Sequence, residues 1–238
     1  MSRLALAVLI LASVLPASGE ASERPGPVVL ELFTSQGCSA CPPADSVLAA
    51  LGRRDGVIAL AFHVPYWDHM GWRDPFALAV SAQRQRAYAR AMKQRSIYTP
   101  QIVVQGAAET VGHDRAAVER LIAAAPPIAA IAVTMLNRNP PVLSLRIPPL
   151  EEPLAEAQLW LAVYLAHQVV HVANGENAGQ TLQHAFVVRW AAAVARVETA
   201  PAELSLTVPE AERADGIAVL LHGPRQGPLL AAGRIALR

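Results

Sequence analysis

The sequence has little cysteine and no surplus of charge of either sign. Its 238 residues hold two cysteines, Cys38 and Cys41, which exclude a scaffold of several disulfides and a four-cysteine zinc module. Twenty basic side chains balance nineteen acidic ones, and the net charge of +1 excludes a strongly basic surface for nucleic acid. Charged residues make up 16% and hydrophobic residues 53%, so the chain can bury a sizeable core and is not disordered.

The first 21 residues have the pattern of a signal peptide. Arg3 supplies the positive charge and Leu4 to Leu15 form an apolar run. Small residues follow, with Gly19 and Ala21 suited to cleavage. As a helix the apolar run spans about 18 Å, too short for a hydrocarbon core of about 30 Å. We therefore expect an exported protein, periplasmic or secreted, with no stable membrane anchor after residues 1–21 are cleaved.

Residues 26–125 alternate short apolar strands with helical patterns. The alternation predicts a β-α-β-α-β-β-α order whose first crossover favours a parallel strand pair. Pro42 in the first turn and Asp114 as an N-cap support the starts of the first and last helices. The expected strands are 28–33, 57–62, 101–104 and 109–111, and the expected helices are 42–53, 74–94 and 114–124.

Residues 128–238, which follow Pro126 and Pro127, show strand patterns only. Turn signals such as Asn174-Gly175 separate the strands. About seven strands over this length predict an antiparallel β-sandwich-like domain. The expected strands are 128–136, 142–147, 157–172, 182–195, 204–208, 216–222 and 229–237.

The two cysteines stand three positions apart, directly before Pro42 and the first predicted helix. This spacing suits a small-loop disulfide, or an attacking thiol with a resolving thiol. A helix N-terminus carries free N–H groups and partial positive charge, so the pKa of Cys38 should lie below the ~8.5 of a free cysteine. We predict that Cys38 is the exposed nucleophile and that Cys41 resolves a mixed disulfide.

The chain resembles the thioredoxin-like superfamily in four features. These are the first strand, the CxxC motif at a helix start, the βαβ order, and Thr99-Pro100 before a later strand. The resemblance implies that the Thr99–Pro100 peptide is cis. It also implies that Pro100 faces the cysteines and presents a backbone edge to substrate.

A closer resemblance is to the exported family known as DUF1223. It rests on residues 31–45 (ELFTSQGCSACPPAD), 63–76 (HVPYWDHMGWRDPF), 98–101 (YTPQ) and 175–179 (GENAG). It covers nearly all of the chain after the signal peptide. It implies an α/β fold in which a thioredoxin-like domain, residues 26–125, is followed by an antiparallel β-sandwich-like domain, residues 128–238.

Aromatic residues gather directly after the second predicted strand, whose carboxyl end should lie near the CxxC loop. We predict that Tyr66 and Trp67 form a substrate platform with Thr99 and Pro100. His63, at the end of that strand, would bind substrate and assist proton transfer. An equally weighted alternative is a cluster that packs under a long loop without contacting substrate.

Glu31 is the one charge in the first apolar strand, and alternation puts it on one face with Val29 and Phe33. Burial without a cation would raise its pKa from ~4.3 towards neutrality. A buried acid beneath the second cysteine resembles the arrangement in thioredoxin-like enzymes. We predict that Glu31 is a general base that takes the proton from Cys41, with a purely structural glutamate as the alternative.

These patterns predict an exported thiol–disulfide oxidoreductase, or a thiol-dependent partner protein, that acts on a protein or on a small thiol or disulfide. This hypothesis needs no cofactor, no metal and no nucleic acid. Two alternatives stay open. One is a metal (copper) handling protein in which Cys38, Cys41 and either His63 or His69 are ligands. The other is a binding module whose disulfide only stiffens its loop.

Overall fold

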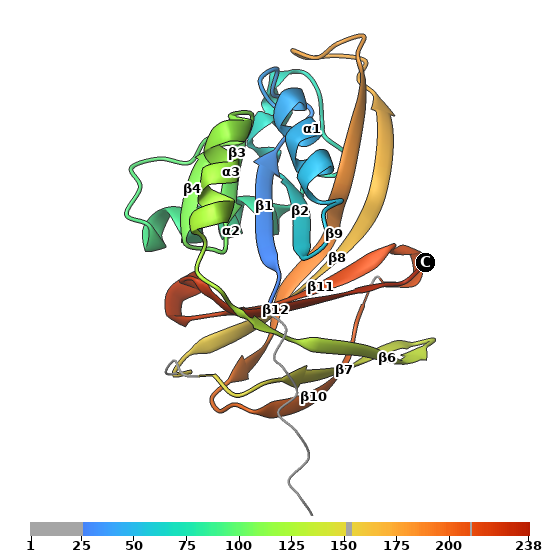
Figure 1. Cartoon of the computed structure of the whole chain (residues 1–238). Helices are drawn as coiled ribbons and strands as arrows, with labels where there is room; N and C mark the ends of the chain where they lie inside the picture. Colours follow the sequence, from blue (N-terminus) through green and yellow to red (C-terminus); the bar gives the residue numbers. More distant parts are fainter. Residues whose placement is uncertain (1–25, 151–153, 210) are drawn as a thin grey trace, which may run out of the picture.

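The computed structural model describes residues 26–150, 154–209 and 211–238 (Figure 1). The predicted signal peptide, residues 1–21, lies outside the described residues. No helix in the described ranges is long and apolar enough to cross a membrane.

The first half forms the elements that its local patterns predict. Pro42 begins the first helix, and the Asp114 side chain accepts a hydrogen bond of 2.9 Å from the backbone N–H of Ala117, which caps the last. The elements are β1 (Val28–Thr34), α1 (Pro42–Leu51), β2 (Val57–His63), the 3-10 helix η1 (Pro65–Met70), α2 (Ala79–Ala91), β3 (Gln101–Val104), β4 (Ala108–Val111) and α3 (Arg115–Ala124).

The second helix begins at Ala79 rather than at Asp74, where the sequence predicts it. The Asp74 carboxylate accepts a hydrogen bond from the backbone N–H of Phe76, and the backbone N–H of Leu78 bonds to the carbonyl of His63. These contacts hold residues 74–78 as a loop against the end of β2. Helical hydrogen bonds therefore start only after Leu78.

The second half contains strands and two short 3-10 turns. They are β5 (Ala129–Ala130), β6 (Ala132–Arg138), β7 (Pro141–Ile147), β8 (Ala157–His171), β9 (Thr181–Val197), β10 (Ala202–Thr207), η2 (Ala211–Arg213), β11 (Gly216–His222), η3 (Pro224–Gln226) and β12 (Leu229–Ala236). All of the strands predicted for this half are present.

The predicted fold class, a thioredoxin-like domain followed by a β-sandwich-like domain, is wrong. Strands from both halves form one mixed nine-stranded sheet in the order β4-β3-β1-β2-β9-β8-β11-β12-β5, and β10-β7-β6 form a second, small sheet. The halves meet where β2 pairs in parallel with β9 at Ala61 and Val187. At fifteen and seventeen residues, β8 and β9 are roughly 50–55 Å long, so they reach both ends of the molecule (Figure 1).

The two faces of β1 pack against different helices. Leu30 and Leu32 lie in one apolar cluster with residues of α1 and α3, which cover the front of the sheet in Figure 1. Val29 and Phe33 point the other way and pack with Tyr88 of α2. A third cluster fills the space between β8, β11 and the small sheet. The polar side chains of β1 and β2 are therefore sorted onto one face or the other by strand alternation.

Candidate functional site

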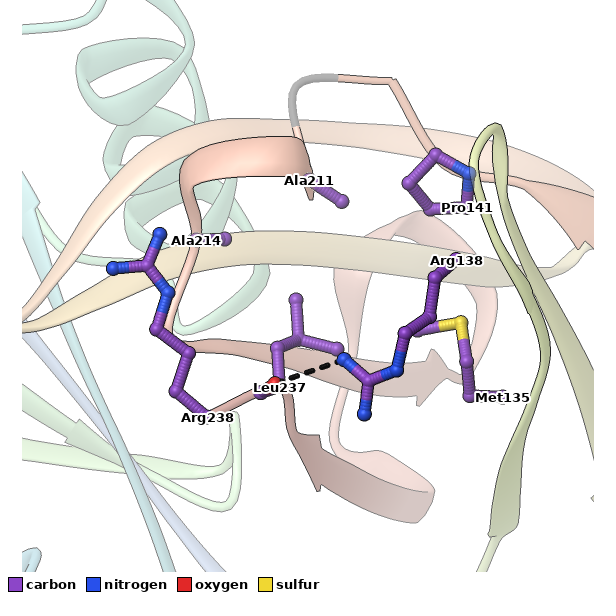
Figure 2. Close-up of a pocket in the computed structure, with 7 residues that line it drawn as sticks. All are labelled: Met135, Arg138, Pro141, Ala211, Ala214, Leu237 and Arg238. Atoms are coloured by element: carbon purple, nitrogen blue, oxygen red, sulfur yellow. Dashed lines mark hydrogen bonds between the residues drawn. The ribbon is translucent and has the colours of Figure 1, made fainter.

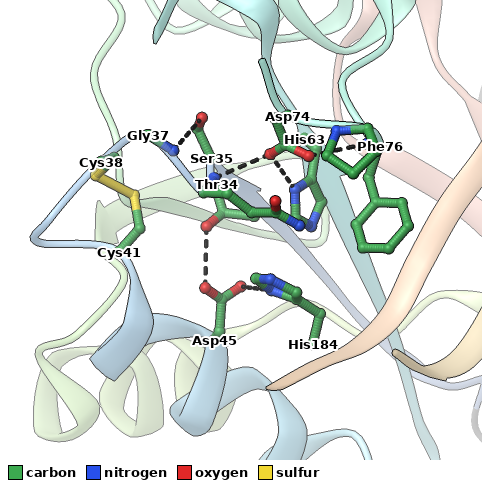
Figure 3. Close-up of polar contacts among 12 residues, drawn as sticks. Thr34, Ser35, Gly37, Cys38, Cys41, Asp45, His63, Asp74, Phe76 and His184 are labelled. Atoms are coloured by element: carbon green, nitrogen blue, oxygen red, sulfur yellow. Dashed lines mark hydrogen bonds and ion pairs between the residues drawn. A yellow bond between two sulfur atoms is a disulfide. The ribbon is translucent and has the colours of Figure 1, made fainter. Parts of the chain in front are cut away.

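Cys38 and Cys41 form a disulfide in the loop that leads from β1 into α1 (Figure 3). Their Cα atoms are 5.4 Å apart, and Cys41 is the N-cap residue of the helix. Cys38 is 1% exposed and Cys41 is 0% exposed, whereas Ser39 and Ala40 between them are exposed. The prediction of a bonded pair at the helix start is confirmed, and the expected exposure of Cys38 is wrong.

The turn between β8 and β9 covers the disulfide loop. The Asn177 amide, 1% exposed as a residue, donates to the carbonyls of Gln36 at 2.9 Å and Cys38 at 3.1 Å. The Glu176 carboxylate accepts from the backbone N–H and the hydroxyl of Ser39, at 3.1 and 2.8 Å. We call this turn, residues 172–180, the cover turn. It rises beside the start of α1 at the top of Figure 1.

Three of the predicted substrate-binding residues lie around the same loop. A Cβ on Gly37 would come within 3.1 Å of the Trp67 Cβ, so Trp67 packs closely on the residue before Cys38. The Trp67 indole N–H donates to the Thr99 hydroxyl at 2.7 Å. The Thr99–Pro100 peptide is cis, as the resemblance implies. Trp67, Thr99 and Pro100 thus form one connected wall.

Tyr66 turns away from this wall towards α2. Its hydroxyl donates to the Gln85 side chain at 3.1 Å. Burial raises the pKa of Tyr66 to about 12, so the phenol stays protonated and fixes the position of η1 against the helix.

Glu31 lies on the face of β1 opposite to α1 and does not meet the cysteines. Its carboxylate accepts two hydrogen bonds from Arg84 of α2, at 2.5 and 2.9 Å, and one from the Tyr88 hydroxyl at 2.5 Å. Burial by itself would raise the pKa of Glu31, but the adjacent Arg84 cation outweighs it and holds the pKa below its usual value. The carboxylate is therefore an ionised partner of Arg84.

His63, at the end of β2, lies on the α1 face and is fully buried (Figure 3). Its Nδ1 is 2.7 Å from the carboxylate of Asp74. That carboxylate also accepts the backbone N–H groups of Gln36 at 2.9 Å and Phe76 at 2.8 Å. Burial would raise the pKa of Asp74, but His63 and these donors outweigh it and lower the pKa. Asp74 thus ties the end of β2 to the loop that carries Cys38.

Asp45 and His184 complete a buried group beside His63. Asp45 lies one helical turn after Cys41, and its carboxylate accepts the Thr34 hydroxyl at 3.2 Å. His184 Nδ1 is 3.7 Å from the other carboxylate oxygen, and its ring centre is 4.8 Å from that of His63. One ligand atom from each of the three residues lies within 4.8 Å of the others. We call Asp45, His63 and His184 the Asp-His cluster.

Sequence reasoning missed most of these polar residues. Asp45 carried a readable signal, because residues four apart on a helix share a face and it follows Cys41 by four. Asn177 stood in a segment that resembles the DUF1223 family, with no role attached to it. His184 offered no signal, because it lies in a strand pattern more than a hundred residues from the motif.

A pocket of roughly 260 Å³ lies elsewhere, between the small sheet and the end of β12 (Figure 2). Its lining residues are Met135, Arg138, Pro141, Ala211, Ala214, Leu237 and Arg238. The Arg138 guanidinium donates to the carbonyl of Leu237 at 3.1 Å and so closes part of it. None of these residues belongs to the segments that surround the disulfide.

The fold and the site together define a strand-rich protein with a buried CxxC disulfide beneath a hairpin turn. The chain belongs to the family described as "Protein of unknown function (DUF1223)", which matches residues 29–222. No protein with a curated description matches it significantly.

Two solved structures share the fold. The crystal structure of protein AGR_C_4864 from Agrobacterium tumefaciens superimposes with a TM-score of 0.77 at 24% identity, over 91% of this chain and 97% of that one. HBP35 of Porphyromonas gingivalis gives a TM-score of 0.59 at 14% identity, over 90% of this chain and 76% of that one. At these identities the likeness concerns the fold alone.

Proposed function

We propose that the protein is an exported thiol–disulfide oxidoreductase whose reactive group is the Cys38–Cys41 pair. The observation that carries the proposal is the disulfide at the N-terminus of α1, which reacts without leaving the loop between two polypeptide walls. One wall is the cover turn, and the other is Trp67 with Thr99 and Pro100. A protein or a small thiol would be the substrate, and the apolar segment at residues 4–15 supports export.

The exchange is written in the direction from substrate to protein. A substrate thiolate attacks the Cys38 sulfur, the Cys38–Cys41 bond breaks, and Cys41 leaves as a thiolate. A second substrate thiolate then attacks its partner in the mixed disulfide and releases Cys38 as a thiolate. The products are a substrate disulfide and a protein dithiol, and two electrons have passed to the protein. The reverse sequence reduces a substrate disulfide.

The burial of both sulfurs makes the cover turn part of this reaction. Attack needs an approach along the S–S axis, and both sulfur-bearing residues are at most 1% exposed. The exposed Ser39 and Ala40 lie between the cysteines, so movement of a few contacts uncovers the bond. The contacts to release are the two hydrogen bonds of Asn177 and the two made by Glu176.

Trapping of the mixed disulfide tests the proposal. In Cys41→Ser the resolving thiol is missing, so Cys38 should accumulate a mixed disulfide with glutathione or with a thiol-bearing peptide, visible by intact mass. The matched variant Cys38→Ser should accumulate much less. Equal trapping by both variants would reverse the roles of the two cysteines. A wild-type disulfide that exchanges only in denaturant would overturn the proposal.

Removal of the cover-turn contacts gives a second readout. Asn177→Ala deletes two hydrogen bonds that contribute about 1–3 kcal/mol to closure, so reduction of the disulfide by dithiothreitol should be roughly tenfold faster or more. Asn174→Ala, at an exposed position of the same turn, is the control and should react like the wild type. Equal reduction rates in all three proteins would show that the turn does not limit access.

A further inference from the structure

The Asp-His cluster contains buried nitrogen atoms that have no hydrogen-bond partner. They are Nε2 of His63 and both ring nitrogens of His184. The two histidines are 0% and 2% exposed. A buried polar atom without a partner costs about 1–3 kcal/mol, and native proteins carry few of them. Three in one place, beside a carboxylate, point to a ligand that binds there.

His63 is set in the form that binds a metal ion. Asp74 is held as a carboxylate by its own donors, so the proton of the neutral His63 ring lies on Nδ1, which faces Asp74 at 2.7 Å. The lone pair is then on Nε2, the unpartnered atom. A histidine that gives its other N–H to a carboxylate is the usual outer-shell arrangement at metal sites, because it fixes the ring and raises its basicity.

Asp45 and His184 supply the other donors from the opposite side of the space. Thr34 occupies one oxygen of the Asp45 carboxylate, which leaves the oxygen nearer His184 for a cation. The Asp45 and Asp74 carboxylates together offset the charge of a divalent ion. The chemistry of two imidazoles and one carboxylate suits first-row divalent metals such as zinc.

The geometry points to a divalent transition-metal site formed by His63 Nε2, a ring nitrogen of His184 and an oxygen of Asp45. In a tetrahedral zinc site with bonds of about 2.0–2.1 Å, ligand atoms lie roughly 3.3 Å apart. The three atoms here lie within 4.8 Å of one another, so small side-chain rotations bring them to one ion. Water would fill the fourth position. The site contains no sulfur and is therefore independent of the proposed thiol exchange.

Cobalt binding to the oxidised mature chain is the test. Co²⁺ in a site of low symmetry has intense visible ligand-field absorption, and the closed disulfide keeps the thiols out of its coordination sphere. Refolding in the presence of the metal removes slow entry as an obstacle. We expect one equivalent per chain with visible absorption, displaced by Zn²⁺, and a rise in the melting temperature in proportion to binding.

Four variants assign the ligands. Asp45→Asn and His184→Gln should weaken binding by more than ~100-fold, and Asp74→Asn, which alters the outer shell, by about 10–100-fold. His171→Ala removes an exposed histidine of β8 and should bind like the wild type. Loss of binding in His171→Ala, with full binding in Asp45→Asn, would identify an adventitious surface site and overturn the proposal.

Two further measurements cover variants that fail to fold and the competing thiol site. In the wild type, the imidazole NMR signals of His63 and His184 should change with one equivalent of Zn²⁺ while that of His171 does not. The double variant Cys38→Ser, Cys41→Ser should keep the cobalt spectrum. A spectrum that vanishes in the double variant would place the metal on the cysteines and overturn the assignment, with no bearing on thiol exchange.

Discussion

Two groups of buried polar side chains lie on opposite faces of the β1–β2 pair and differ in how their charges are matched. On the α2 face, Arg84 bonds to Glu31, to Tyr88 and, at 2.7 Å, to His222. We call these four residues the arginine cluster. On the α1 face, the Asp-His cluster has three nitrogens without a partner. Both groups are buried in one molecule, so burial alone does not separate them.

The difference in pairing separates a structural group from a functional one. In the arginine cluster each charge has a partner, and the rings of Phe62, Tyr88 and Trp160 lie 5.4, 5.2 and 4.8 Å from the guanidinium carbon. The cluster links β1, α2 and β11, which come from both halves of the chain. A fold selected only for stability would pair the histidines of the other cluster as well.

Arg84→Met should have the largest effect, because it leaves the Glu31 carboxylate buried without a cation. We expect a loss of about 3–5 kcal/mol in the free energy of unfolding, measured with urea. Arg86→Met, at an exposed position of the same helix, is the control and should stay within about 0.5 kcal/mol of the wild type. Equal stability of the two variants would refute a structural role for the arginine cluster.

Glu31→Gln should cost about 2–3 kcal/mol, because the amide keeps the shape and loses a charge-assisted acceptor. The rate of mixed-disulfide resolution should not change, since Glu31 faces α2 and the cysteines lie at α1. Stopped-flow thiol exchange and urea unfolding on the same samples measure both. A slower resolution step with unchanged stability would instead support the general base that the sequence suggested.

Acid should weaken the arginine cluster through His222. Burial, and then the Arg84 cation, lower the pKa of His222 to about 3, whereas the unfolded chain titrates near 6.5. The unfolded state therefore binds the extra proton between these values, and stability falls as the pH drops from about 6.5 towards 3. The slope from this one proton is about 1.4 kcal/mol per pH unit. His222→Gln should lower that slope between pH 6 and 5, and an unchanged slope would assign the proton elsewhere.

His184→Leu should have the smallest effect on the metal-free protein. It replaces two unpartnered nitrogens by apolar atoms, so the lost packing and the removed desolvation cost nearly cancel. We expect a change below about 1 kcal/mol in the presence of a chelator. A loss as large as that of Arg84→Met would mean that His184 is paired in solution, and the contrast between the clusters would fail.

The elements of the fold follow largely from local sequence. Alternation and turn residues place each strand of the second half within a few residues, and Pro42 and Asp114 mark helix starts. Local patterns say nothing of which strands pair. The predicted two-domain fold failed for that reason, because the exposed edge of β2 is completed by β9 from the far half of the chain.

The candidate site divides in the same way. By itself the sequence determined the reactive pair at a helix start, the proline beside it and the nearby Trp67, because their spacing or order along the chain carries the signal. Only the tertiary structure decided that Arg84, on a helix whose basic residues suggest a solvated face, is buried against Glu31. It also brought Asn177 and His184 to the α1 face, since β8 and β9 are long enough to carry them there and hydrogen bonding across the sheet is not written in either strand alone.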